Sequence, residues 1–287
     1  MQTQISSQAK SLEQTAEVIS RKNELRAQAM KRRVRDLSLQ IAVFIVIMGT
    51  WQVLTSRKII DPFFFSSPSD IVLHIWSWVV KGTSQGPLYI HFVVTFEETI
   101  LSFLLGGIAG IIFGYALGVN ELLSVVLGPY IKMLNAIPRV VLVPIFILWL
   151  GLGMSSKVAS GFVLTFFIVF FNAFQGVREV DRNLVNNARL LGANKRQLAR
   201  HVIIPSALTW ILSSLHSSFG FALIGAVVGE FIGSTEGLGY LIAQAQGSFD
   251  TTGVFAGMVI LSVTALLADW LVTKLEKRFI AWRHVRK

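Results

Sequence analysis

The chain has 287 residues, of which 53% are hydrophobic and 15% are charged, against about 25% charged residues in an average soluble domain. A single soluble core could not bury this much apolar surface, so the composition favours a bilayer as the solvent. The absence of cysteine excludes disulfides, thiolate catalysis and thiolate metal sites. The formal net charge of +10 would suit a nucleic acid or an acidic surface as partner, but the positions of the charges indicate another role.

The first 36 residues are polar and basic, and the first apolar run begins near Leu37 and continues for a full membrane width. A cleaved signal peptide instead has a short apolar run soon after a few charges, followed by small residues. We therefore interpret residues 1–36 as a basic tail. The run from Arg21 to Arg35 could also form a helix on anionic lipid, although holding the N-terminus inside is a sufficient role for it.

Six segments have the length and composition of membrane spans, since a helix needs about 20 mostly apolar residues to cross the hydrocarbon core. This predicts an all-α membrane protein with a transmembrane domain over residues 37–273. The third span is the least regular, because Pro138 and Pro144 lie inside it and neighbouring groups must then satisfy the freed carbonyls. The expected spans are residues 37–54, 99–119, 137–152, 158–177, 206–228 and 252–272.

The basic residues predict the orientation of these spans. Of the 26 Lys and Arg residues, 22 lie in the N-terminal tail, in the loops after the second and fourth spans, and in the basic tail 274–287. Cytoplasmic loops carry an excess of Lys and Arg. We therefore expect both termini and the loop 178–205 in the cytoplasm, and we interpret the positive charge as a topology signal rather than as a nucleic-acid surface.

Small residues form a regular pattern in the second span, where glycine occupies every fourth position on one helix face. Small residues at this spacing let two helix backbones approach closely. A tight interface in a moving bundle and ordinary membrane packing both account for the pattern. The glycines are Gly106, Gly110, Gly114 and Gly118.

The fifth span carries a polar face. Ser213, Ser217 and Gly220 lie on one side of the expected helix, with His216 at the edge. A polar stripe facing lipid would be costly, so this face is expected to line the route of a polar solute or to make inter-helix hydrogen bonds. We expect no proton relay through His216, because no acidic partner is evident at its depth.

The acidic residues of the spans lie near span ends, where carboxylates reach water. Glu97 and Glu98 begin the second span, Glu230 follows the fifth, and Asp269 lies beside the basic tail, with which we expect it to pair. No carboxylate pair in mid-membrane and no repeated pair of broken helices is evident in the sequence. Both observations weaken the case for an ion-coupled secondary transporter.

The loop 178–205 is too long and too patterned for a simple connector. Leu184, Ala188 and Leu191 recur at helical spacing, Gly192 ends that helix, and Asn194 can cap a second one. We therefore expect a helix, a turn and a second helix with an exposed apolar ridge. Such a ridge on a cytoplasmic loop indicates a protein partner.

This loop resembles a motif of ABC-importer permeases, in which E-A-A is followed by three residues, G, nine residues and I-x-L-P. Asn186 and Asn187 replace the family's Glu and Ala, which removes any salt bridge of the family glutamate but keeps the helical pattern. Residues 138–153 and 229–245 further resemble the group that imports nitrate, sulfonates, taurine and bicarbonate. The positions that align with the motif, the two replaced ones included, are Asn186, Asn187, Ala188, Gly192, Val202, Ile204 and Pro205.

The resemblance implies a type I ABC importer permease fold in a bacterial inner membrane, with a homodimer forming the path of a small anionic solute such as a sulfonate, nitrate, taurine or bicarbonate. It implies two cytoplasmic ATPase subunits that bind ATP and Mg, so this chain itself needs no catalytic residue, cofactor or metal. It also implies a periplasmic or lipid-anchored solute-binding protein, for which the segment 234–240 offers a docking site or a short pore helix. The expected ATPase contact consists of Leu191, Gly192, Ala193 and Asn194.

Other classes of protein leave different signatures. The sequence has no G-x-x-x-x-G-K-[ST] loop and no nucleophile elbow, and its five histidines show no metal-ligand spacing. An ion-driven secondary transporter stays open and predicts uptake that collapses with the ion gradient. A membrane-embedded enzyme or anchoring subunit also stays open and predicts turnover by the isolated chain.

Overall fold

The computed structural model describes the backbone of residues 2–280 and the side chains of residues 28–274. Residues 281–287 of the expected C-terminal tail lie outside this range, as do the side chains of the expected N-terminal tail before residue 28. The described backbone is helical between its loops and has no strand. The helices are α1 Gln2–Ser56, α2 Pro62–Phe65, α3 Pro68–Lys81, α4 Leu88–Val119, α5 Glu121–Ala136, α6 Val143–Leu150, α7 Met154–Arg178, α8 Arg182–Leu190, α9 Lys195–Leu198, α10 Ile204–Ile232, α11 Leu238–Gly247 and α12 Thr251–Ile280.

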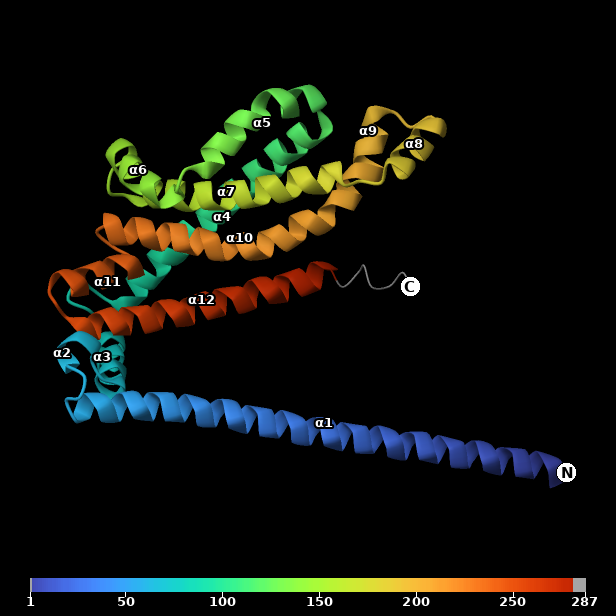
Figure 1. Ribbon diagram of the computed structural model, residues 1–287, viewed down its shortest axis with the longest axis horizontal. Coiled ribbons are helices and arrows are strands. Elements are labelled where there is room, and N and C mark those ends of the chain that lie inside the picture. The colour runs from blue at the N-terminus through green and yellow to red at the C-terminus, as the bar shows by residue number, and fades with distance from the viewer. Residues whose placement is uncertain (1, 281–287) are drawn as a thin grey trace. The chain divides into compact units, whose positions relative to one another are not determined.

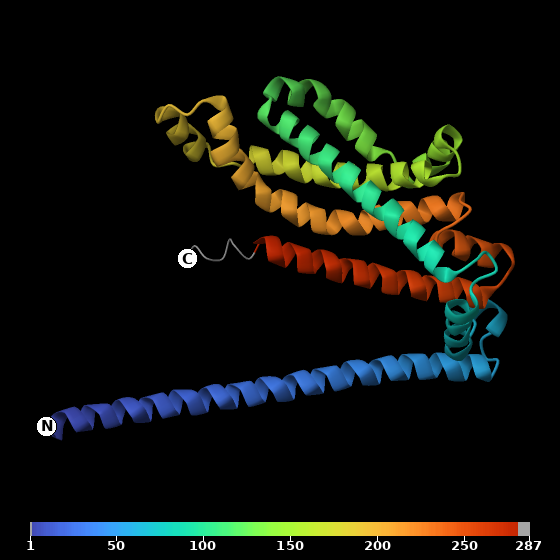
Figure 2. The same ribbon diagram turned by 180° about the vertical axis from the view of Figure 1, so that it is seen from behind.

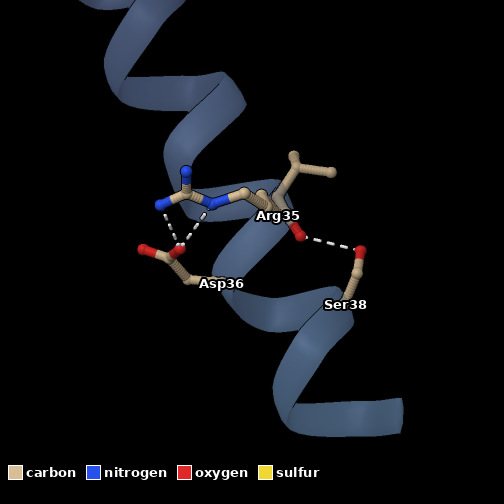
Figure 3. A network of polar contacts seen from close by, with 4 residues as sticks. Arg35, Asp36 and Ser38 are labelled. Carbon is tan, nitrogen blue, oxygen red and sulfur yellow. Dashed lines mark hydrogen bonds and ion pairs between the residues drawn. The ribbon is translucent and has the colours of Figure 1, made fainter.

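The chain divides into two compact units, residues 1–69 and 70–287. In the first unit, α1 is one uninterrupted helix, so no helix break separates the expected basic tail from the first apolar span. Figure 3 shows a polar network on α1, where Nε and Nη2 of Arg35 donate to Asp36 Oδ1 and the Ser38 hydroxyl donates to the Val34 carbonyl. Beyond this point most of the apolar side chains of α1 are exposed, as expected of a helix that faces lipid.

The second unit is built on α4, α7 and α10, which pack along most of their lengths (Figures 1 and 2). Helices α4 and α7 run parallel, because Gly106 lies against Phe162 and Gly118 lies against Val177. Helix α10 runs antiparallel to α7, because Gly225 lies against Gly161 near the start of α7 and Trp210 lies against Gly176 near its end. Figure 2 shows α4, coloured teal to green, lying obliquely across the other two helices.

The expected third span is not one straight helix. Helix α5 occupies residues that were expected to form the loop after the second span. It is followed by a 3-10 turn, Arg139–Leu142, and by α6. The two halves, Glu121–Ala136 and Arg139–Leu150, are bent by 85° at their break. The break falls at Pro138, because proline has no N–H to donate and disfavours helical backbone in the residue before it.

Within the part of the chain that the structure describes, five helices are long and apolar enough to cross a membrane, or six if this bent pair counts as one span. The parallel course of α4 and α7 favours six, since the chain between them must return across the thickness that α4 has crossed. The expected class, an all-α membrane protein with six spans, is therefore confirmed, with a broken helix as its third span.

Helix α12 brings the chain back along α10 in the opposite direction. Ile242 of α11 lies against Gly257 near the start of α12, whereas His216 of α10 lies against Asp269 near its end. Figure 1 shows the consequence: α8 and α9 lie beyond one end of α7 and α10, and α11 lies at the opposite end. The described end of α12 therefore points toward the end of the bundle that carries α8 and α9.

Candidate functional site

The loop between α7 and α10 folds into two short helices for local reasons. Asp181 caps α8 by accepting from the Asn183 N–H at 2.8 Å. At the other end of α8, Gly192 has a φ of +82°, and its N–H donates to the Arg189 carbonyl at 2.9 Å. The Ala193 N–H donates to the Ala188 carbonyl at 3.0 Å, which completes a Schellman motif around a glycine in the left-handed region.

The second helix of the loop begins with a reciprocal cap. The Asn194 side chain accepts from the Gln197 N–H at 2.9 Å, while the Gln197 side chain accepts from the Asn194 N–H at 2.9 Å. This capping box satisfies backbone donors that have no partner inside the helix. The turn from Leu191 to Asn194 is therefore held by its own hydrogen bonds.

The turn displays apolar side chains to solvent. Leu190 and Leu191 are 85% and 88% exposed, and Leu184 is also exposed, whereas Ala188 is half-buried. Asn186 and Asn187 are exposed on α8. The apolar surface is thus concentrated at the turn itself, which favours a protein partner there.

The second helix of the loop continues into the fifth span without a break. A π-helical turn, Ala199–Ile203, joins α9 to α10, so residues 195–232 form one helical run. Pro205 lies just after the wide turn, at the start of α10, because its missing N–H is tolerated there. Leu198 is buried and anchors the start of the run. The turn is therefore joined to α10 by continuous helix rather than by a flexible loop.

The polar face of α10 is open in the single chain. Ser213, Ser217 and Gly220 are exposed along one side, whereas Ser214 and Ser218 point inward, where their hydroxyls donate to carbonyls of their own helix. An exposed row of this kind on a helix of a membrane bundle requires either a second protein surface or water.

One expectation about ionisable residues on this side of the molecule was wrong. His216 has an acidic neighbour, because its Nε2 lies 3.4 Å from Asp269 Oδ1. Asp269 therefore faces α10, while its expected partners in the tail beyond residue 274 lie outside the described side chains. The pair forms because α10 and α12 run antiparallel, which brings residues far apart in sequence to one depth.

The glycine face of α4 lies against α7. A Cβ atom built on Gly110 would come 2.9 Å from the Phe166 carbonyl oxygen, and one on Gly114 would come 2.6 Å from the Phe170 carbonyl oxygen. Gly106 and Gly118 are equally close to Thr165 and Val177. The backbones of the two helices are in direct contact, which requires these glycines. The sequence analysis missed the matching approach of α7 and α10, at Gly161 and Gly225.

The largest departure from expectation is a buried polar network at the other end of the bundle. Glu98, Lys157 and Glu230 are 2%, 0% and 0% exposed, and both carboxylates lie close enough to Lys157 to interact with its charge. We expected Glu98 and Glu230 at boundaries where they reach water. That was wrong, because α4 begins at Leu88 rather than near residue 99, and because α11 folds back over Glu230.

Comparisons with known proteins give one family match and several similar transport permeases. Residues 106–281 match the family model described as binding-protein-dependent transport system inner membrane component. A protein named as an aliphatic sulfonates transport permease, SsuC of Bacillus subtilis strain 168, is 34% identical over 83% of this chain and 85% of its own length. The formylaminopyrimidine transport permease ThiX of Halalkalibacterium halodurans is 32% identical over 88% of this chain and 99% of its own length. The taurine transport permease TauC of Escherichia coli K12 is 26% identical over 86% of this chain and 90% of its own length.

A solved structure shares the fold. An inward-facing form of the MetNI methionine ABC transporter superposes with a TM-score of 0.58 at 18% identity, over 67% of this chain and 95% of that chain. At this identity the likeness shows the architecture alone. It confirms the expected type I importer permease fold.

Proposed function

Since the chain belongs to the family of binding-protein-dependent transport system inner membrane components and is a permease subunit of an ABC importer, we propose that the turn between α8 and α9 receives a partner ATPase. The observation that carries the proposal is the pair of exposed leucines, Leu190 and Leu191, on a turn that runs into α10 without a break. ATP binding in the partner would displace this turn, and α10 would carry the displacement into the membrane.

The family implies ATPase and solute-binding protein partners in general. We infer that two copies of this chain pair across the membrane and that each engages one of two ATPase subunits, which hold ATP and Mg. The exposed face of α10 supports the pairing, because a second copy could cover or share it. We call the turn between α8 and α9, Leu191 to Asn194, the coupling turn. The basic residues near it support a cytoplasmic location, at the inner face of a bacterial inner membrane.

The solute is proposed to be a small anion of the sulfonate class. Two of the relatives are named for aliphatic sulfonates and for taurine, and the hydroxyls of Ser213 and Ser217 on α10 can donate to sulfonate oxygens. The relative named for formylaminopyrimidine makes a neutral heterocycle the second candidate. Competition for uptake between an alkyl sulfonate and a pyrimidine separates the two.

The proposal is tested by purifying the chain with its partners in detergent, assaying the complex for ATPase activity, and reconstituting it for uptake. Leu191→Asp places a charge in the proposed contact, so we expect the ATPase subunits to dissociate and uptake to fall by more than about tenfold, the effect of losing one buried apolar contact of about 1.5–3 kcal/mol. Asn183→Asp is the matched control, since it adds the same charge at an exposed position of α8.

Wild-type copurification and uptake by Leu191→Asp would overturn the assignment of the turn. Uptake that needs an ion gradient, with no ATPase bound to the wild-type chain, would instead support a secondary transporter.

A further inference from the structure

The start of α11 is capped by side chains from distant parts of the chain. Three successive backbone N–H groups, those of Gly237, Leu238 and Gly239, have no carbonyl partner inside the helix. They donate instead to His91 Nδ1 at 3.1 Å, to Thr95 Oγ1 at 2.9 Å and to Glu230 Oε2 at 2.7 Å, in the order listed. We call these three acceptors the α11 clamp.

Two of the acceptors, Thr95 and Glu230, are linked to each other, and all three are closed to water. The Thr95 hydroxyl donates to Glu230 Oε1 at 2.6 Å while it accepts from Leu238, so it joins α4 to both α10 and α11. Each acceptor residue is at most 1% exposed. Buried hydrogen bonds to a charged group are among the strongest that a protein makes. The clamp therefore ties α11 to two long helices at one point.

The backbone of the turn before α11 is shaped to fit the Glu230 carboxylate. Gly237 has a φ of +110°, and a Cβ atom there would lie 2.2 Å from Glu230 Cδ. A Cβ atom on Gly239 would lie 2.4 Å from the Val227 carbonyl oxygen. Only glycine leaves room for the carboxylate to reach the N–H groups, so the turn and the acid are matched to each other.

The charge of the clamp is balanced from a third helix. Lys157 of α7 is fully buried, its ammonium group donates to the Leu152 carbonyl, and it interacts with the charges of both Glu230 and Glu98. A buried carboxylate without a counter-charge would be strongly destabilising. Helices α4, α7 and α10 thus each supply an ionisable group to the region that holds α11.

Glu230 and the coupling turn lie at opposite ends of one helical run, residues 195–232. We propose that Glu230, with Thr95 and His91, is a positioning residue of transport: it fixes α11 to the far end of α10, so that movement begun at the coupling turn reaches the opposite mouth of the bundle. The proposal rests on the proposed function above, since the clamp would transmit the motion that the ATPase starts.

The test compares Thr95→Val with Thr95→Ser in the purified permease–ATPase complex. Valine matches threonine in shape but removes the hydroxyl, whereas serine keeps it. Hydrogen exchange is measured at the amides of residues 237–239, and ATP hydrolysis is measured per solute imported. For Thr95→Val we expect exchange to rise by about tenfold, the worth of one or two net hydrogen bonds, and the ratio of ATP hydrolysed to solute imported to rise as well. Thr95→Ser should behave like the wild type.

A merely structural role would lower hydrolysis and import together, in proportion to the folded complex that remains. Equal exchange and an equal ratio in the two variants would overturn the proposal. If Thr95→Val does not fold, His91→Ala provides a second route, because it removes the acceptor of the Gly237 N–H and leaves Thr95 and Glu230 in place. Raised exchange at residue 237 and a raised ratio of ATP hydrolysed to solute imported are then expected. Unchanged exchange would contradict the assignment of the clamp to these three acceptors. Failure of the ATPase to copurify with the wild type would refute the proposed function alone, since hydrogen exchange still reports on the clamp.

Discussion

The two ends of the helical run 195–232 are built in opposite ways. At the coupling turn, Gly192 and Asn194 hold the backbone through hydrogen bonds to residues within a few positions, and the leucines face outward. At the α11 end, Glu230 is fully buried and its hydrogen bond to Thr95 joins residues 135 positions apart. The first end is held by local hydrogen bonds and displays its leucines to a partner, whereas the second end depends on contacts between distant parts of the chain. Substitutions should therefore affect binding at the first end and folding at the second.

The largest effect is expected at the buried end, from Glu230→Ala. This change leaves Lys157 without one of its counter-charges and leaves the Gly239 N–H without an acceptor. Loss of one partner from a buried ionic group costs about 3–5 kcal/mol, so we expect little folded protein in detergent. Thermal unfolding measures this, with the exposed Glu236→Ala as control. Wild-type stability of Glu230→Ala would contradict the comparison of the two ends.

Lys157→Met is expected to be the next most severe change, because it removes the cationic group with which the buried Glu98 and Glu230 both interact. Adding Glu98→Gln removes one of these two acidic groups. The double variant should therefore be more stable than Lys157→Met alone, with a coupling of about 0.5–3 kcal/mol. A thermal-unfolding cycle of the four proteins measures it. Strictly additive effects would show that the three groups do not act as one network.

The middle of the bundle should be sensitive to volume rather than to charge. Gly114→Val would place a side chain into the Phe170 carbonyl of α7, at a site with no free space. Overpacking of this kind costs about 1–3 kcal/mol. Gly128→Val is the matched control, because a Cβ atom on Gly128 meets nothing within 4 Å. Equal stability of the two variants would show that α4 and α7 can separate without loss.

The smallest effect on stability is expected at the coupling turn. Asn194→Ala removes the capping box and should cost about 1 kcal/mol, confined to α9. Local hydrogen exchange at residues 195–198 should rise, while the unfolding temperature of the whole protein should stay close to that of the wild type. A large drop in that temperature would show that the turn is part of the folding core, and the contrast between the two ends would fail.

The amino-acid sequence by itself determined the features that depend on near neighbours. Apolar length indicated the membrane helices, Gly192 and Asn194 indicated the turn of the coupling loop, and the spacing of glycines in the second span indicated a face that the structure sets against α7. Each of these signals comes from residues within one or two helical turns, where backbone geometry already decides which groups can meet.

Only the tertiary structure decided which distant polar groups meet. The sequence placed Glu98 and Glu230 at span boundaries and left His216 without an acidic neighbour, because hydropathy does not report the direction in which helices pack or where a chain folds back. The antiparallel course of α10 and α12 brings Asp269 to His216, and the return of α11 buries Glu230 beside Thr95. The physical reason is that a buried charge is stable only with partners, and the partners of Glu230 come from three other helices, α4, α7 and α11.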